Sequence, residues 1–364
     1  MPFSDFHGNA DVVRTLREML VRERFPHAVI LSGPQGSGKF TLTQMVAKAM
    51  NCLERPVSEG LPDFCGHCAN CVRIAQADAL EERFAEAVEA RDNLRDADKR
   101  ETRIFVQTHP DVLIIPPDPP QMLVKVDQVR HVIREIYYKP AEGRERVYIF
   151  SDAEFMKEAA NSLLKVLEEP PEFATVFLLT DNPSALLPTI RSRCMILRLA
   201  PVAAEEVERY LAEVRSEWKP RERALVARVC GGGLGRARSF DLAAYLAARQ
   251  DALTLLGPAM GTLDPSALFR VTDTYRSGAE GKAKIEQLIR TLYSLLEDLL
   301  FLKSGTPEFV RNHDIQPELA RMATEADFPW IVGATQRLGE VESGMRRNLL
   351  RSLALDSFAS SLER

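Results

Sequence analysis

The segment AVILSGPQGSGK, residues 28–39, decides the fold of the N-terminal part of this chain. An apolar run, typical of a buried strand, leads directly into a glycine-rich loop. Beyond the loop, apolar residues recur at helical spacing at Leu42, Met45, Val46 and Ala49. The order strand, loop, helix with the spacing G-x-x-x-x-G-K indicates a phosphate-binding loop in an α/β domain.

The loop retains the groups that hold phosphate but lacks the one that holds magnesium. Backbone N–H groups and a lysine can surround phosphate oxygens, so the predicted nucleotide-binding residues are Gly33, Gly36, Gly38 and Lys39. The next position normally carries a Ser or Thr hydroxyl that coordinates Mg²⁺, but here it is Phe40. Thr41 is a poor substitute, because one residue along a helix is a rotation of roughly 100°.

The acidic residues with which a nucleotide hydrolase holds its metal ion are also altered. The strand ending at Phe150 leads into Ser151 and Asp152, with Glu154 beyond, where an acidic pair would hold the metal and polarise water. Losing both metal-holding positions predicts that the chain hydrolyses no ATP itself. Two interpretations of the loop remain open: weak nucleotide binding, or retention for the fold alone.

The strand pattern defines a first domain over residues 1–200. Further strands are predicted at residues 112–115, 147–150, 175–179 and 195–199, separated by segments long enough for helices. This alternation predicts a parallel sheet with crossover helices. After Pro201 the pattern becomes helical and breaks at Gly231-Gly232-Gly233, so we expect a small helical domain over 201–245. Residues 246–364 show only amphipathic helical patterns.

A highly charged segment, residues 78–103, interrupts the first domain. Leu80, Phe84 and Val88 lie at helical spacing on one narrow apolar face. We expect a solvated helix or helical hairpin inserted at the surface. A charged spacer and a partner-docking arm are both compatible with this composition.

Four cysteines have the spacing of a metal site. Three of them, Cys65, Cys68 and Cys71, are separated by two residues each, and Cys52 lies 13 residues upstream. Four thiolates suffice for a closed tetrahedral Zn²⁺ site with a structural role. An iron–sulfur cluster and unrelated free thiols are the alternatives. Cys194 and Cys230 are expected in the core.

Composition limits the remaining classes of function. With 52 acidic and 47 basic residues the net charge is −5, so the chain has no general attraction for a phosphate backbone. No apolar run is long enough to span a bilayer, which argues against membrane function. The N-terminal residues do not resemble a signal peptide, so we expect a cytoplasmic protein.

Two segments resemble motifs of a known family: residues 158–171, EAANSLLKVLEEPP, and residues 187–194, LPTIRSRC. Over roughly residues 3 to 240 the chain resembles the AAA+ clamp-loader subunits of bacterial DNA polymerase III. The absent Thr after Lys39 and the missing acidic pair place it nearer the delta-prime branch than the ATP-hydrolysing gamma/tau branch. The resemblance implies a P-loop domain with a zinc module at about 52–71, a helical lid and an all-α collar.

The resemblance also implies roles for particular residues. Arg193, in the triplet Ser192-Arg193-Cys194, would project in trans into a neighbouring subunit's ATP site. Residues 180–182 resemble the first sensor, and Arg236 the second, nucleotide-facing sensor. The collar would hold this chain with gamma/tau and delta subunits in a hetero-pentamer that loads the sliding clamp onto primed DNA.

Two rival functions remain open. The first is an active gamma/tau-like ATPase that holds Mg²⁺ through Asp152 and Thr41. The second is a zinc-stabilised DNA-binding adaptor with no loader role, which the net charge of −5 disfavours.

Overall fold

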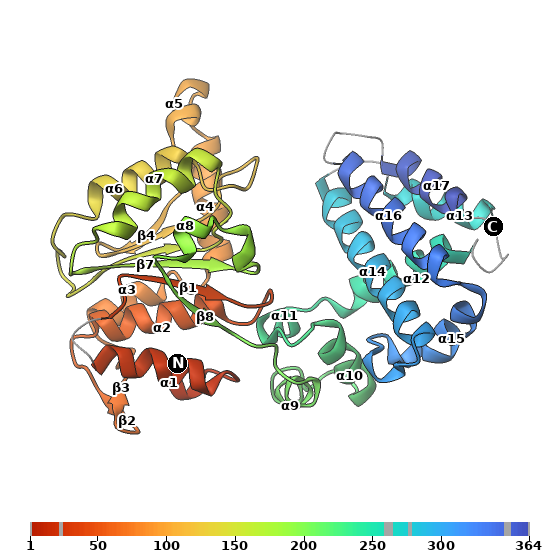
Figure 1. The fold of residues 1–364 in the computed structure, drawn as a ribbon, viewed down its shortest axis with the longest axis horizontal. Coiled ribbons are helices and arrows are strands. Elements are labelled where there is room, and N and C mark those ends of the chain that lie inside the picture. The colour runs from red at the N-terminus through yellow and green to blue at the C-terminus, as the bar shows by residue number, and fades with distance from the viewer. Residues whose placement is uncertain (1, 22–24, 258–264, 276–278, 346–350, 363–364) are drawn as a thin grey trace. The chain divides into compact units, whose positions relative to one another are not determined.

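The computed structural model describes residues 2–21, 25–257, 265–275, 279–345 and 351–362 (Figure 1). The chain forms two compact units. The first contains residues 1–203 together with 232–236, and the second contains 204–231 together with 237–364. The division into domains of 1–200, 201–245 and 246–364 remains a prediction. Among the described residues, no helix combines the length and apolar character needed to cross a bilayer.

A six-stranded sheet forms the centre of the first unit, in the order β4-β5-β6-β7-β1-β8. Its strands are β1 (Ala28–Ser32), β4 (Val106–His109), β5 (Val112–Ile115), β6 (Arg146–Phe150), β7 (Ala174–Thr180) and β8 (Met195–Arg198). The pairs β5–β6, β6–β7, β7–β1 and β1–β8 are parallel, as the sequence predicts. A separate short hairpin pairs β2 (Val57–Ser58) with β3 (Leu61–Pro62).

The edge strand β4, which the sequence does not predict, pairs antiparallel with β5. Only Pro110 and Asp111 separate the two strands. A parallel pairing requires a crossover of a dozen or more residues, so this short connection permits only a hairpin. The fold is therefore an α/β sandwich with a mixed sheet.

Helices cover both faces of the sheet (Figure 1). The helices of this unit are α1 (Ala10–Val21), α2 (Lys39–Asn51), α3 (Ala69–Ala75), α4 (Leu80–Asp92), α5 (Asp96–Glu101), α6 (Val126–Glu135), α7 (Lys157–Glu168) and α8 (Pro188–Arg191), with 3₁₀ turns Phe3–Asp5 and Pro183–Ala185. On β1, Val29 and Leu31 pack toward α1 and α2, whereas Ala28 and Ile30 pack toward α6 and α7. This alternation follows the two-residue period of a strand and produces two cores.

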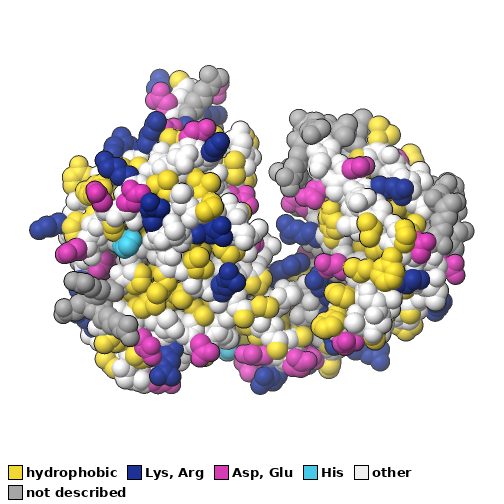
Figure 2. Space-filling model, viewed as in Figure 1, with side chains coloured by type: hydrophobic (Ala, Val, Ile, Leu, Met, Phe, Trp, Pro, Cys, Tyr) yellow, Lys and Arg dark blue, Asp and Glu magenta, His cyan; other side chains and the backbone are white. Residues whose placement is uncertain are grey.

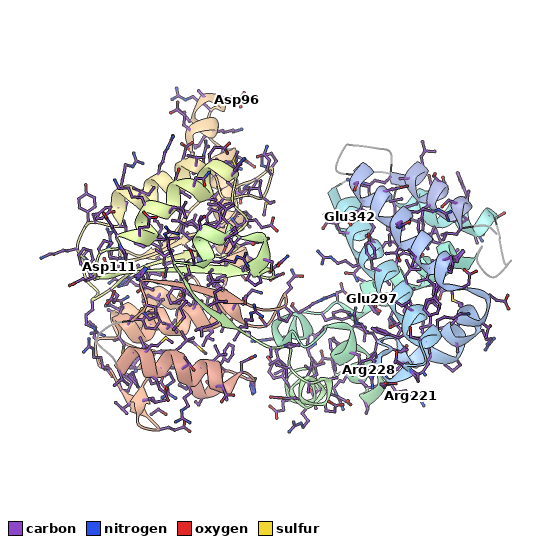
Figure 3. The ribbon with its side chains drawn as sticks, in the orientation of Figure 1. Asp96, Asp111, Arg221, Arg228, Glu297 and Glu342 are labelled. Atoms are coloured by element: carbon purple, nitrogen blue, oxygen red, sulfur yellow. The ribbon has the colours of Figure 1, made fainter. Side chains whose placement is uncertain are left out.

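The charged segment 78–103 forms α4 and α5, as expected, and α5 protrudes from the unit with Asp96 at its start (Figures 1 and 3). No residue of α4 is fully buried. Ion pairs attach the segment to the rest of the unit: Asp78 lies 2.6 Å from the buried Lys48, and Arg91 Nη1 lies 2.6 Å from a carboxylate oxygen of the fully buried Asp118. Lys125 Nζ, at 3.1 Å, and Arg103 Nε, at 3.9 Å, also face that carboxylate.

The second unit is entirely helical in its described residues, as predicted for the C-terminal region. Its helices include α9 (Ala204–Val214), α10 (Pro220–Val229), α12 (Leu242–Leu256), α13 (Pro265–Thr274), α14 (Ala279–Lys303), α15 (Gln316–Glu325), α16 (Phe328–Met345) and α17 (Arg351–Ser361), with 3₁₀ turns Pro307–Phe309 and His313–Ile315. Helix α11 (Leu234–Arg238) begins in the first unit and ends in the second. Arg228 of α10 donates to the Glu308 and Val310 carbonyls, which ties α10 to the turn after α14 (Figure 3).

At the opposite end of the sheet from the glycine-rich loop, Asp111 ties the β4–β5 turn to the loop before β6 (Figure 3). Its carboxylate accepts the N–H groups of Ala141, Glu142 and Gly143 at 2.7, 2.9 and 2.6 Å. Burial acts to raise the pKa of Asp111, but these three donors outweigh it and the pKa falls below its usual value. The carboxylate therefore stabilises the folded state in its ionised form.

We expect Asp111→Asn to lower the free energy of unfolding at pH 7 by about 2–4 kcal/mol, because an amide replaces charge-assisted bonds with weaker ones. A depressed folded-state pKa adds stability above the unfolded value and loses it as the pH falls. The difference between variant and wild type should therefore be constant above about pH 5 and shrink at lower pH. Denaturant unfolding from pH 3 to 7 measures it, with the exposed Glu172→Gln as control. A pH-independent difference would contradict this assignment.

Candidate functional site: a closed phosphate loop, a cysteine cluster and a paired arginine

The glycine-rich loop connects β1 to α2 as predicted, and two of its glycines need a conformation that other residues avoid. Gly36 and Gly38 have φ values of 77° and 86°, in the left-handed region. A Cβ atom at Gly36 would lie 2.6 Å from the Arg236 backbone nitrogen, and one at Gly38 would lie 2.8 Å from the Phe6 ring. Both positions therefore require glycine, because of their left-handed backbone conformation and because a side chain would clash with the neighbouring residue.

The loop is closed over by residues from a distant part of the sequence. Gly235 donates its N–H to the Gly36 carbonyl at 2.8 Å. The predicted nucleotide-facing residue Arg236 follows, and its main chain lies against Gly36. With Phe6 against Gly38, two protein groups pack directly on the loop. The sequence does not predict this closure, because Gly235 lies about 200 positions from Gly36 and Phe6 about 30 positions from Gly38.

Lys39, the predicted phosphate-binding lysine, is occupied by partners within the protein. Its ammonium group donates to the Gly33 carbonyl at 2.7 Å, to the Pro34 carbonyl at 3.0 Å and to Asp181 Oδ1 at 2.6 Å. Asp181 lies just after β7, in the stretch that resembles the first sensor. A phosphate group would have to replace these partners to engage Lys39.

The magnesium-holding positions differ from those of a hydrolase, as the sequence indicates. Phe40 is half-buried and packs on the core beneath α1 and α2, while Thr41 is exposed. Asp152 and Asp181 line a cavity of about 420 Å³ beside the ends of β6 and β7. Burial and, to a lesser extent, repulsion from Glu154 and Asp181 together raise the pKa of Asp152 to about 6, although the side chain reaches solvent.

The four predicted cysteine ligands converge. The sulfur atoms of Cys52, Cys65, Cys68 and Cys71 all lie within 4.8 Å of one another, and none is in a disulfide. The Cys65 N–H points at the Cys52 sulfur (3.3 Å) and the Cys68 N–H at the Cys65 sulfur (3.2 Å). A tetrahedral ion with bonds of about 2.3 Å places thiolates roughly 3.8 Å apart, so this donor set fits a metal ion.

The backbone favours the ionised form of one thiol of the cluster, whereas burial raises the pKa of Cys65 and of Cys71. Burial acts to raise the pKa of Cys68, but the N–H groups of Cys71 and Leu53 outweigh it and lower the pKa to about 6. Cys52 and Cys71 are fully buried and belong to the core that also contains Ile74 of α3. His67 is exposed and pairs with Glu54 at 2.8 Å, so it lies outside the four-sulfur set.

The predicted finger residue Arg193 lies between α8 and β8 and is about one-third exposed. Its guanidinium donates to Glu168 Oε1 at 2.6 Å, to the Thr189 carbonyl at 2.8 Å and to Ser192 Oγ at 3.3 Å. The sequence does not indicate this pairing, which brings the end of α7 to the start of β8.

The charge distribution does not define a nucleic-acid interface on the face shown in Figure 2. Among the described residues on that face, Lys and Arg side chains are interspersed with Asp and Glu. A protein that binds DNA through its backbone usually concentrates positive charge on one surface. The mixture gives no support to a DNA-binding adaptor.

The sheet order, the glycine-rich loop and the following helical region define a P-loop protein of the AAA+ class. Residues 8–203, more than half of the chain, match the family model described as "DNA polymerase III, delta subunit". The chain belongs to this family.

Individual relatives include both branches of the clamp-loader subunits. The chain is 31% identical to DNA polymerase III subunit tau of Escherichia coli over 72% of its own length and 36% of the relative. It is 30% identical to subunit delta' of Bacillus subtilis over 56% of its length and 50% of that protein. It is 32% identical to subunit delta' of Pseudomonas aeruginosa over 48% of its own length and 43% of that protein.

These matches span about a third of the tau subunit and about half of each delta' subunit. Among solved structures, a DNA polymerase III gamma-subunit-related protein from Thermotoga maritima aligns over 97% of this chain and 98% of its own. The TM-score of that alignment is 0.40, at 15% identity.

Proposed function

We propose that this chain is a delta-prime-type clamp-loader subunit that supplies Arg193 in trans to a neighbouring ATPase and hydrolyses no ATP itself. One observation carries the proposal: Lys39 is satisfied by Asp181 and two loop carbonyls, beside Phe40 in the position of a magnesium ligand. Such a loop is poorly suited to hold Mg²⁺ and a triphosphate, so any nucleotide binding by Gly33, Gly36, Gly38, Lys39 and Arg236 is weak or absent.

Arg193 has the chemistry that the trans role requires. A planar, permanently charged guanidinium can contact two phosphate oxygens and stabilise the charge that develops during phosphoryl transfer. Its position after α8 and its partial exposure leave it accessible to a second chain. The neighbour would be a gamma/tau-type ATPase within a hetero-pentamer that also contains a delta-type subunit, acting on the sliding clamp and primed DNA.

The cysteine cluster would bind one structural Zn²⁺. All four thiolates would be ligands, which leaves no open coordination position for catalysis. The residues 201–245 and 246–364 would serve as lid and collar, with the collar joining the subunits.

An active gamma/tau-like ATPase is the second candidate, because the match to the tau subunit of E. coli covers more of this chain than the delta' matches do. In that case Asp152 and Thr41 would hold Mg²⁺. The exposed Thr41 and the partner-filled Lys39 weigh against it.

The isolated protein discriminates between the two candidates. We expect purified wild-type protein and Lys39→Ala to show the same background rate of phosphate release with saturating ATP and Mg²⁺. Calorimetric titration with ATP should give weak binding or none. Turnover well above background in the wild type, abolished in Lys39→Ala, would instead establish the gamma/tau-like function.

A further inference from the structure

Arg193 is bound by hydrogen-bond acceptors of its own chain, and these contacts compete with its binding to a nucleotide on a neighbouring subunit. Glu168 Oε1 and the Thr189 carbonyl accept bonds of 2.6 and 2.8 Å from the two terminal nitrogens, and Ser192 Oγ lies 3.3 Å away. A guanidinium has five N–H donors, so two remain for any other acceptor. The adjacent carboxylate also offsets the positive charge that phosphate would meet.

The end of α7 explains why the pair forms. Glu168 is the last residue of α7 and Glu169 follows as its C-cap. The C-terminus of a helix carries partial negative charge, so two carboxylates there are unfavourable without a nearby cation. Arg193 provides that cation, whereas Glu169 is exposed and its charge contributes no ion pair within the described residues.

We infer that Glu168 is an intrachain counter-ion that restrains Arg193 and is exchanged for phosphate oxygens of the neighbour's nucleotide when the subunits assemble. This inference rests on the proposed function. Exposed ion pairs are weak, and here the two side chains are 33% and 50% exposed, so the pair can open at small cost. Glu168 is therefore a positioning residue that sets how often the arginine is available.

Glu168→Gln tests this role, with Glu169→Gln as the matched control. Both variants remove one negative charge from the same helix end, but only Glu168 pairs with Arg193. In a loader reconstituted with its own ATPase subunits, Glu168→Gln should raise ATP turnover at saturating ATP by about two- to fivefold, the range of an exposed pair. Glu169→Gln should match the wild type, because it leaves the pair intact.

The same two substitutions are then made in Arg193→Ala, where Glu168→Gln should have no effect. Gel filtration of the assembly and thermal unfolding of each variant check that folding and association are unchanged. Unchanged or slower turnover in Glu168→Gln, with a large loss in Arg193→Ala, would overturn the restraint and leave the proposed function intact. Unchanged turnover in Arg193→Ala would overturn both.

Discussion

Arg193→Ala should slow ATP hydrolysis at the adjoining site of a reconstituted loader by about a thousandfold or more. The reason is that an arginine supplied in trans contributes roughly 10³ to 10⁵ to the rate of phosphoryl transfer. The loss should appear in kcat, since the guanidinium acts on charge that develops in the transition state. Steady-state phosphate release, with one ATPase subunit facing this chain, measures it.

Two further variants separate the role of Arg193 from general damage. Arg193→Lys keeps the charge but loses the planar fork, so it should recover only part of the rate. Arg198→Ala, an exposed arginine on the neighbouring strand β8, should match the wild type. Full activity in Arg193→Ala, with the complex intact by gel filtration, would exclude the trans role.

Cys71→Ser should produce the largest loss of stability. Cys71 is completely buried within the four-cysteine cluster and the adjoining core, so the change removes a proposed metal ligand and places a hydroxyl in the core. Loss of a structural metal typically costs on the order of 5 kcal/mol or more. We expect one zinc per wild-type chain by elemental analysis, little or none in the variant, and a much lower unfolding midpoint.

Cys194→Ala is the matched control, because burial raises the pKa of this solitary thiol to about 12 and it lies outside the cluster. It should keep the full zinc content. Iron with visible absorbance in the wild type would favour an iron–sulfur cluster. Wild-type protein that contains no metal and has normal stability would indicate that the four cysteines are free thiols.

The sequence predicts the elements whose signal is local. The strands expected at 28–32 and 112–115 agree with the bounds in the structure. The cysteine spacing predicts the cluster that the structure brings together. The strand β4 was missed because its short run gives little apolar alternation, although the two-residue turn at Pro110 and Asp111 was a usable signal. The hairpin β2–β3, with strands of two residues, is too short to leave a periodic pattern.

Contacts between distant residues were beyond prediction from one sequence. Gly235 meets Gly36 across about 200 positions, and Asp181 meets Lys39 across 142. The second pair forms because the sheet order places the ends of β1 and β7 side by side, whereas Gly235 belongs to α11. Glu168 and Arg193, 25 positions apart, meet because α7 and α8 pack together, which neither residue's local pattern reveals.

The buried Asp118 carboxylate faces two cations from the segment 78–103, Arg91 and Arg103, and a third, Lys125, from the loop before α6. Deleting residues 79–103, which keeps Asp78 as the partner of the buried Lys48, would remove Arg91 and Arg103 and still leave Lys125 beside that acid. Since an uncompensated buried charge is what makes such deletions costly, the architecture permits this projection to be acquired or discarded during evolution without rebuilding the sheet beneath it.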